Sequence, residues 1–562
     1  MSFLTRKKTV ALAAVALASS AMLALSGCSA GSSANGGAST VTLFAGTAGN
    51  FTENFNPLNN TGAALAGTLG VLYEPLYYYN TARSQEPTPE LASASKWNSD
   101  GTQLTITTRS GVKWSDGKPF SASDVAYTFN LIASNPGLNT SGAKFTVKQD
   151  GDNTVVLTFD STSFTLGPSL LGNTPMIPEH VWSKIKDPTS VTNTDPVGTG
   201  PYKLKSFTPQ SYVLTKNDSY WGTGADQPKV ENVRYVALAN ADAATSALEA
   251  GSTDWMGAFL PTLDSIVKKN KDLSYTNTPV ATTSLFTCAN ADLGCTGAQT
   301  DPAVRQAIYY AMDRTQMNKQ ASAGFSKPGS PSLLAPNTNK ENIVSGDVEL
   351  PSTANTAKAK SILEAAGYSK NGNGYYAKDG QEIDLTINVV SGWTDYDTLC
   401  TLLQGQLKQA GIKLSVNQMA QNAWTQSQVA GKFQLSVNSL NVGVSSSPYF
   451  IYNDYLSSSN TAKVGSSATT NLTRYSNSTV DAAIKTIAGT TDEATQKKEY
   501  GVIQQELAKD MPYIPIYVNS SLAEYNNARA TGWPTQSNLY AFPQPWKSWD
   551  NGIVLKRIRP AK

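Results

Sequence analysis

LASASKWNSDGTQLTITTRSGVKWSDGKPFSASDVAYTFN, the stretch Leu91–Asn130, carries the clearest local structural signals in the chain. Leu104 and Ile106 alternate with threonines, which is the period-two pattern of a half-buried strand. Turn clusters at 98–101 (NSDG) and 115–117 (SDG) each end in a glycine that can adopt a positive φ. The pattern predicts a β-hairpin bounded by turns.

A helix is predicted to follow this hairpin. Ser121 has Asp124 three residues later, which is an N-cap residue followed by an acid in the first turn. Val125, Phe129 and Ile132 then recur on one helical face. Taken alone, the stretch indicates one hairpin and one amphipathic helix.

The same stretch carries a longer motif. Residues 114–120 (WSDGKPF) and 123–125 (SDV) resemble the signature of family 5 extracellular solute-binding proteins, the oligopeptide- and dipeptide-binding subunits of ABC importers. Further segments resemble motifs of that family in the same order: 54–58 (NFNPL), 71–76 (VLYEPL), 196–202 (PVGTGPY), 217–222 (NDSYWG), 304–307 (VRQA), 311–314 (AMDR) and 511–516 (MPYIPI). The resemblance extends from about Val41 to the C-terminus.

Helix signals in the second half indicate an α/β protein. Asp301 and Pro302 are a typical N-cap and first helical residue. Amphipathic patterns predict helices at 356–366 and 395–410, each followed by a glycine. Alternating apolar residues at 412–416 predict a strand directly after the helix at 395–410. A helix followed by a glycine and then a strand is the connectivity typical of α/β proteins.

At 562 residues the chain is too long for one ordinary core. The resemblance implies a two-lobed periplasmic-binding-protein-like α/β fold, with hinge strands and an extra subdomain inserted in lobe I. From the motif positions we expect lobe I at 41–66, 200–287 and 518–562, the inserted subdomain at 67–199, and lobe II at 288–517.

The resemblance also implies a function. Such a protein captures a solute between its lobes, which close by hinge motion, and delivers it to an ABC permease energised by an ATPase subunit. We expect a monomer that binds an oligopeptide. The alternative within the same family is an oligosaccharide.

The ligand class depends on lobe II. Peptide-binding relatives carry an aspartate just after a strand of this lobe, where it pairs with the α-ammonium of the peptide. Here the strand is predicted at 433–437, and the residues that follow include no carboxylate before Asp454. Tryptophans favour sugar instead, because a flat apolar ring suits the C–H face of a sugar. The resulting candidate ligand-binding residues are Asn54, Phe55, Trp255, Trp393, Trp424, Asn441, Ser446 and Tyr449.

The N-terminus has the features of a lipoprotein signal. Residues 6–8 (RKK) are basic, 10–25 are rich in alanine and leucine, and 25–28 (LSGC) resembles a bacterial lipobox. We therefore expect a signal peptide at 1–27, a lipidated (palmitate-bearing) Cys28 and a flexible tether at 28–40. The protein is expected to be exported and lipid-anchored at the outer face of the cytoplasmic membrane.

Charge and cysteine content agree with an exported binding protein. Without the three basic residues of the signal peptide, 41 basic residues face 42 acidic ones, so nothing indicates nucleic acid as a partner. Outside the cytoplasm, Cys288 and Cys295 are expected to form a disulfide, whereas Cys400 falls on an apolar helical stripe and is expected to be a buried thiol. The single histidine, His180, cannot form a multi-histidine metal site, and we expect neither metal nor cofactor.

An enzyme is a remote alternative. Exported serine acyltransferases use Ser-x-x-Lys, which occurs here at Ser93/Lys96, Ser141/Lys144, Ser183/Lys186 and Ser265/Lys268. The companion Ser-Asp-Asn and Lys-Thr-Gly motifs are absent. The sequence therefore predicts no catalytic residue.

Overall fold

The computed structural model describes residues 39–47, 49–59, 65–139 and 143–562. The expected signal peptide, Cys28 and Ser141 lie outside these residues, whereas Thr40 already begins the first strand. Ser39–Lys562 forms one compact unit. Within the described residues, no helix combines the length and the apolarity that a membrane crossing requires.

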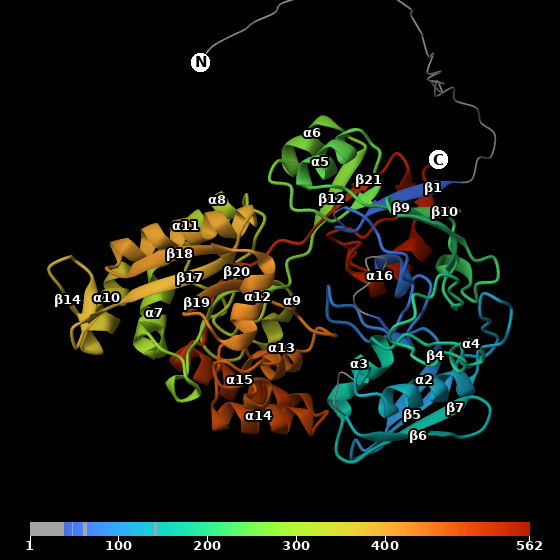
Figure 1. Cartoon of the computed structure of the whole chain (residues 1–562), viewed down its shortest axis with the longest axis horizontal. Coiled ribbons are helices and arrows are strands. Elements are labelled where there is room, and N and C mark those ends of the chain that lie inside the picture. Colours follow the sequence, from blue (N-terminus) through green and yellow to red (C-terminus); the bar gives the residue numbers. More distant parts are fainter. Residues whose placement is uncertain (1–38, 48, 60–64, 140–142) are drawn as a thin grey trace, which may run out of the picture. The chain divides into compact units, whose positions relative to one another are not determined.

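Lobe I, as we use the name, is built on a seven-stranded sheet with the order β12-β21-β11-β1-β10-β9-β8 (Figure 1). Its strands are β1 (Thr40–Phe44), β8 (Tyr202–Thr208), β9 (Ser211–Lys216), β10 (Asn232–Val236), β11 (Trp255–Met256), β12 (Leu273–Asn277) and β21 (Leu522–Asn526). Alternation along β1 sends Val41 and Leu43 to the face covered by α16 (Ser548–Arg557). Phe44 lies on the other face, with α5 (Ala241–Glu249) and α6 (Leu263–Lys269).

The inserted subdomain contains a four-stranded antiparallel sheet, β4-β5-β7-β6, packed against α2 (Figure 1). These elements are β4 (Ala92–Trp97), β5 (Gln103–Thr108), β6 (Phe145–Gln149), β7 (Thr154–Phe159) and α2 (Ala122–Ser134). The β4–β5 hairpin and the helix predicted from Leu91–Asn130 are confirmed. Ser121 and Asp124 form a complete capping box, and Asp124 also accepts a hydrogen bond from the buried indole of Trp114 at 3.3 Å.

Two glycines of the 196–202 turn are required by close backbone packing. A Cβ on Gly198 would lie 1.9 Å from the carbonyl oxygen of Leu72, and one on Gly200 would lie 2.1 Å from that of Val71. The turn therefore packs against 71–73 at a distance that only glycine allows. This accounts for the two glycines by sterics alone.

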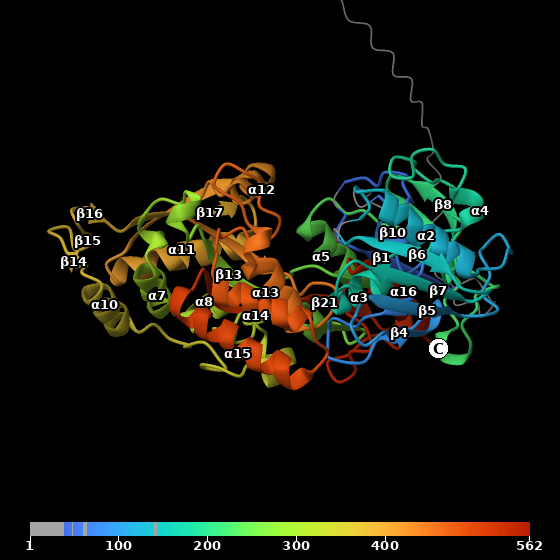
Figure 2. The same cartoon turned by 90° about the horizontal axis from the view of Figure 1, so that it is seen from below.

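Lobe II is built on a five-stranded sheet with the order β18-β17-β19-β13-β20. Its strands are β13 (Thr282–Thr287), β17 (Asp384–Val390), β18 (Lys413–Met419), β19 (Leu435–Leu440) and β20 (Tyr513–Val518). On one face lie α7 (Pro302–Ala311), α8 (Arg314–Ala321), α10 (Thr356–Ala365) and α11 (Thr394–Gln409). On the other lie α13 (Pro448–Leu456), α14 (Ser478–Ala488) and α15 (Glu493–Asp510), with α14 and α15 side by side (Figure 2).

The remaining elements are short. The helices are α1 (Leu65–Thr68), α3 (Gly167–Gly172), α4 (Glu179–Trp182), α9 (Pro336–Asn339) and α12 (Gln421–Ala430), and the 3₁₀ turns are Phe164–Leu166, Gly224–Asp226, Ala291–Leu293, Ala298–Thr300, Lys340–Asn342 and Ser458–Asn460. Small sheets pair β2 (Tyr77–Tyr78) with β3 (Thr88–Pro89), β22 (Ala530–Thr531) with β23 (Arg559–Pro560), and β14 (Ser369–Lys370), β15 (Tyr376–Lys378) and β16 (Gln381–Glu382) with one another.

The two large sheets are joined by two crossing segments, 278–281 between β12 and β13 and 519–521 between β20 and β21. These segments are hydrogen-bonded to each other, from Thr278 N to Ser521 O at 2.9 Å and from Asn519 N to Ala281 O at 2.7 Å. We had expected lobe I to continue to residue 287. Because β13 pairs with β19 and β20, we propose that lobe II begins at the first crossing segment.

Cys288 and Cys295 form a disulfide in the structure, with their Cα atoms 5.5 Å apart. Cys400 is a buried free thiol on α11, and burial raises the pKa of this thiol. A nucleophilic role would need the pKa to be lowered instead. The placement of Cys400 fits the expected packing role.

Candidate ligand-binding site

One edge of the lobe II sheet brings together loops that are far apart in sequence. Strands β17, β18 and β19 are parallel, so their carboxyl ends meet at this edge. Trp393 follows β17, α12 with Trp424 follows β18, and Asn441 follows β19. Ligands of open α/β sheets bind outside the carboxyl ends of the strands, which makes this edge the candidate site.

Trp393 and Trp424 contact each other at this edge. Their ring centroids are 5.4 Å apart with planes at 68°, and Trp393 also contacts Tyr396 at 5.7 Å. Trp393 is half-buried, whereas Trp424 is only 6% exposed. The Nε1 of Trp424 is buried and has no hydrogen-bond acceptor among the described residues. Trp393 is therefore the ring whose surface is accessible to a ligand, and the buried Trp424 packs against it.

Arg474 holds the helix that carries Trp424. Its guanidinium is fully buried and donates to four backbone carbonyls, from Nη1 to Gln428 and Leu472 (both 2.9 Å) and from Nη2 to Val429 (2.6 Å) and Ser466 (3.0 Å). Burial lowers the pKa of this guanidinium. Two of these carbonyls belong to the last turn of α12, so Arg474 fixes the end of that helix.

Hydroxyl and amide groups connect the tryptophan pair to a crossing segment. The Tyr396 hydroxyl lies 2.7 Å from Ser439 Oγ, which lies 2.8 Å from Thr283 Oγ1. Asn519 Nδ2, on the second crossing segment, donates to the Tyr396 hydroxyl at 3.5 Å. The second crossing segment and the candidate site therefore share one polar network.

The loop after β19 supplies the remaining candidates. Asn441 is exposed, and its backbone N–H donates to the Tyr455 hydroxyl at 2.8 Å. Ser446 lines a cavity of about 400 Å³, together with Tyr79 from the inserted subdomain. Tyr449 packs against Phe450 at the start of α13. Asn441 and Ser446 thus keep side chains available to a ligand.

Carboxylates near this edge are partly buried. Burial raises the pKa of Asp395, which follows the Trp393 loop, and of Asp454, which lies on α13. Between Asn441 and Asn453 the sequence has no acid. The structure therefore places no carboxylate on the loop after β19, where peptide-binding relatives are expected to carry one.

Comparison with known proteins identifies the family. The model described as Bacterial extracellular solute-binding proteins, family 5 Middle, matches residues 86–462, which is more than half of the chain. The chain belongs to family 5 of the bacterial extracellular solute-binding proteins. The resemblance inferred from the motifs is confirmed, and with it the two-lobed α/β fold.

Named relatives of this family 5 protein include oligopeptide-binding protein AppA of Bacillus subtilis, which is 25% identical over 510 residues, covering 88% of this chain and 89% of AppA. Protein XP55 of Streptomyces lividans is 27% identical over 434 residues, covering 76% and 75%. A periplasmic oligopeptide-binding protein of Thermotoga maritima has a similar crystal structure, with a TM-score of 0.83, 25% identity and coverage of 93% of this chain and 99% of that one. Its mannohexaose-bound form gives 0.76 at 24% identity, with 94% and 99% covered.

Two predicted ligand residues of this family 5 protein are wrong. Phe55 has no exposed surface, because it packs edge-on against Phe207 and Tyr212 in the core of lobe I. Trp255 is also fully buried; it packs against Trp533, and its Nε1 donates to the Pro543 carbonyl at 2.8 Å. Neither side chain can contact a ligand without unpacking the core.

Asn54 is half-buried. Its Oδ1 accepts a hydrogen bond from Asn56 N at 3.0 Å, which is an Asx turn. The neighbouring Asn56 donates to the carbonyls of Pro188 (2.7 Å) and Val191 (2.8 Å) at the end of the inserted subdomain. The motif 54–58 thus contributes hydrogen bonds between lobe I and the inserted subdomain.

Trp546 was missed by the sequence analysis. It is 44% exposed and lies beside Gly257, which directly follows β11 at the carboxyl edge of the lobe I sheet. Lys547 lies 5.7 Å from its ring centroid, and Phe542 packs beside it at 5.9 Å. Phe542 belongs to a small cluster with Val280 of the first crossing segment. No sequence pattern distinguishes Trp546 from the other tryptophans.

Ser93 and His180, which were considered for enzymatic or metal chemistry, have structural partners. Ser93 Oγ donates to the carbonyls of Thr107 (3.3 Å) and Thr108 (3.4 Å). His180 Nε2 lies 2.8 Å from an Asp116 carboxylate oxygen at the surface. The described residues include no group of three or more His, Cys, Asp or Glu side chains that could hold a metal ion. The family itself consists of binding proteins.

Proposed function

We propose that this family 5 protein is the lipid-anchored substrate-binding subunit of an ABC importer that captures an oligopeptide between its lobes and passes it to the permease. The observation that carries the proposal is the arrangement of the crossing segments. They connect the carboxyl edge of the lobe II sheet with the edge of lobe I where β1, β10 and β11 end. Loops from both edges then face a common cleft that hinge motion closes.

Peptide binding here would rely on neutral groups. The lobe II edge offers the Tyr396–Ser439 hydroxyls and the amides of Asn441 and Asn519, which suit backbone N–H and C=O groups of an extended peptide. A buried α-ammonium would need a counter-charge, and the loop after β19 has none before Asp454. We therefore expect recognition that depends little on a free N-terminus. AppA of B. subtilis is named as an oligopeptide-binding protein, which supports this class.

An oligosaccharide is the second candidate, and the Trp393–Trp424 pair favours it. An exposed tryptophan face can stack on a sugar ring, and the hydroxyl network beside it can bind sugar hydroxyls. The T. maritima protein, titled oligopeptide-binding, has a crystal structure with mannohexaose bound. Trp546 would face the same ligand from lobe I.

Calorimetric titration tests the proposal. The chain from Ser29 onward, which contains the whole compact unit Ser39–Lys562, is titrated with a peptide pool and with a glycan pool. We expect heat from the peptide pool, retained when the peptide N-termini are acetylated. Trp393→Ala should weaken binding by roughly tenfold, the loss of one ring contact of about 1.5 kcal/mol. Trp97→Ala is the matched control, because Trp97 is also half-buried but lies in the inserted subdomain.

Three results would contradict parts of the proposed function. Binding of glycans and not of peptides would replace the first ligand class by the second. Unchanged affinity in Trp393→Ala, or an equal loss in Trp97→Ala, would reject the lobe II edge as the site. Consumption of the solute by pure protein would reject a binding function altogether.

A further inference from the structure

A second cavity, of about 700 Å³, lies away from the edge that carries Trp393 and Trp424. Its walls come from 78–93, 108–111, 221–226 and α16, with Asn153 and Tyr540 in addition. The first two stretches and Asn153 belong to the inserted subdomain, whereas 221–226, Tyr540 and α16 belong to lobe I. The cavity therefore lies at the junction between the subdomain and lobe I.

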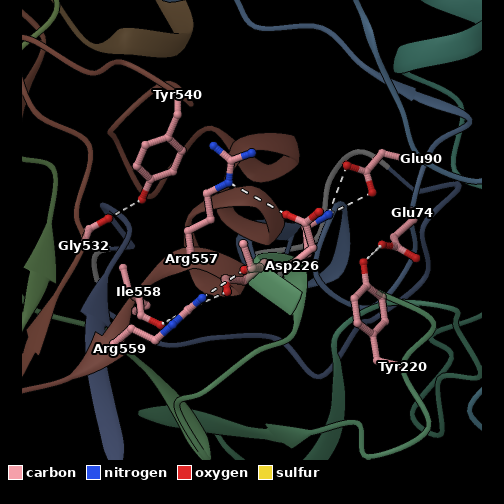
Figure 3. A network of polar contacts seen from close by, with 11 residues as sticks. Glu74, Glu90, Tyr220, Asp226, Gly532, Tyr540, Arg557, Ile558 and Arg559 are labelled. Carbon is pink, nitrogen blue, oxygen red and sulfur yellow. Dashed lines mark hydrogen bonds and ion pairs between the residues drawn. The ribbon is translucent and has the colours of Figure 1, made fainter. Parts of the chain in front are cut away.

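The charged groups of this junction cavity are unequal in number. Four cationic side chains line it (Arg83, Arg109, Lys556 and Arg557), against two carboxylates, Glu90 and Asp226. Lys556 and Glu90 neutralise each other, because Lys556 Nζ lies 3.0 Å and 2.8 Å from the two Glu90 oxygens and both side chains are buried. Asp226 faces Arg557 Nε at 3.9 Å (Figure 3). An excess of two positive charges remains.

Two of the arginines are held in place by aromatic rings. The Arg109 guanidinium lies 4.5 Å from the centroid of Trp221, and its Nε donates to the Glu90 carbonyl at 2.6 Å. The Arg557 guanidinium lies 4.9 Å from the centroid of Tyr540. A stacked guanidinium keeps its edge N–H groups free for acceptors in its own plane, and holding it in advance lowers the entropy lost on binding.

Free donors point to the kind of ligand. Among the described residues, the terminal nitrogens of Arg83 and Arg557 have no hydrogen-bond acceptor; Arg83 uses only Nε, toward Gln85 at 2.7 Å. Arg559, two residues beyond α16, differs because its terminal nitrogens donate to the carbonyls of Lys556, Ile558 and Ala225. Arg559 thus uses its terminal nitrogens within the protein, whereas Arg83 and Arg557 do not. Arg109 is intermediate, because its Nη2 donates to the Pro89 carbonyl at 3.2 Å.

We infer that the junction cavity is a second binding site, for a small anion that bears carboxylate or phosphate groups. Arg83, Arg557 and the Nη1 group of Arg109 would provide the charged donors, and the hydroxyl of Thr223 would provide a neutral one. Neither Trp393 nor Trp424 lines it, and only Gln85 lines both it and the cavity beside Ser446. An anion bound here would join the subdomain to α16 and so stabilise their packing.

The experiment uses the chain from Ser29 onward, with citrate and inorganic phosphate as probes in separate arms. Both are titrated calorimetrically at constant ionic strength, with sodium chloride as the reference anion. Arg83→Gln and Arg557→Gln each remove one charged donor, and each is expected to weaken binding by roughly tenfold. Arg234→Gln is the matched control, because Arg234 is an exposed arginine on β10 that does not line the cavity. Circular dichroism verifies that each variant is folded.

Binding of citrate or phosphate that is lost in both cavity variants and retained in Arg234→Gln supports the site, and the preferred probe tells carboxylate from phosphate chemistry. Failure of both probes to bind more tightly than chloride overturns the inference. Equal losses in Arg234→Gln, or none in the cavity variants, overturn it as well. None of these results depends on whether the solute between the lobes is a peptide.

Discussion

Replacing Glu74 by glutamine should remove the contribution of this carboxyl to the pH dependence of the free energy of unfolding. Glu74 is 2% exposed and accepts hydrogen bonds from the Tyr220 hydroxyl at 2.6 Å and from Trp221 Nε1 at 2.8 Å. Burial raises the pKa of this carboxyl from 4.5 to about 7, which Lys556 opposes and Glu90 reinforces. Figure 3 shows Glu74 pointing toward Tyr220 beside Glu90. Glutamine has nearly the same shape and cannot titrate.

The sign and size follow from proton linkage. Between pH 4.5 and 7 the folded state keeps a proton on Glu74 that the unfolded state has already released. The stability that Glu74 contributes is therefore fully present below pH 4.5 and is lost as the pH rises through about 7. A pKa raised from 4.5 to about 7 corresponds to about 3 kcal/mol. Above that range both states are ionised, and the loss is complete.

Urea unfolding between about pH 4.5 and pH 8 measures the effect. The free energy of unfolding of the wild type, minus that of Glu74→Gln, should fall by about 3 kcal/mol across this interval and then stay constant. Glu249→Gln, which removes an exposed carboxylate on α5, should give a curve parallel to the wild type. Parallel curves for the wild type and Glu74→Gln would refute the assignment of this titration to Glu74.

Three further predictions concern the anchor, the helix of Trp424 and the disulfide. Cys28→Ala should leave a folded protein that is released from the membrane; a variant that stays in the membrane fraction would contradict lipidation. Arg474→Met should lower the free energy of urea unfolding by about 3–5 kcal/mol, because four buried carbonyls lose a charged donor, and an unchanged value would contradict this. Replacing Cys288 and Cys295 by serine should cost about 2–3 kcal/mol in the same assay, with no difference expected once the wild type is reduced.

Local signals in the sequence predicted local structure well. The capping box at Ser121 depends on residues three positions apart, and the helix it starts is observed. Helices expected at 356–366 and 395–410 are found at Thr356–Ala365 and Thr394–Gln409. The glycines that follow them, Gly367 and Gly411, adopt left-handed φ values of 87° and 78°. These features require only neighbouring residues to form.

The candidate site was predicted only in part, because exposure depends on distant residues. Trp255 lies on a two-residue strand between β1 and β21, and Trp533, almost 280 positions later, packs against its ring. Trp393, in contrast, lies between β17 and the start of α11 and is half-buried. Trp546 remains exposed only because of how its loop crosses Gly257, which no local pattern specifies. Tryptophan identity therefore suggested a ligand surface without telling which rings would form it.

The first and last residues of lobe II are neighbours, since Thr282 at the start of β13 pairs with Val518 at the end of β20. The lobe is therefore one continuous stretch of chain whose two ends leave at the same point. Such a segment can be exchanged as a cassette between relatives with only two junctions, both in the crossing segments. Trp393 and Trp424 would be transferred with the cassette, whereas Trp546 would remain in the recipient protein. Chimeras of this kind would show how much of ligand choice each half of the molecule carries.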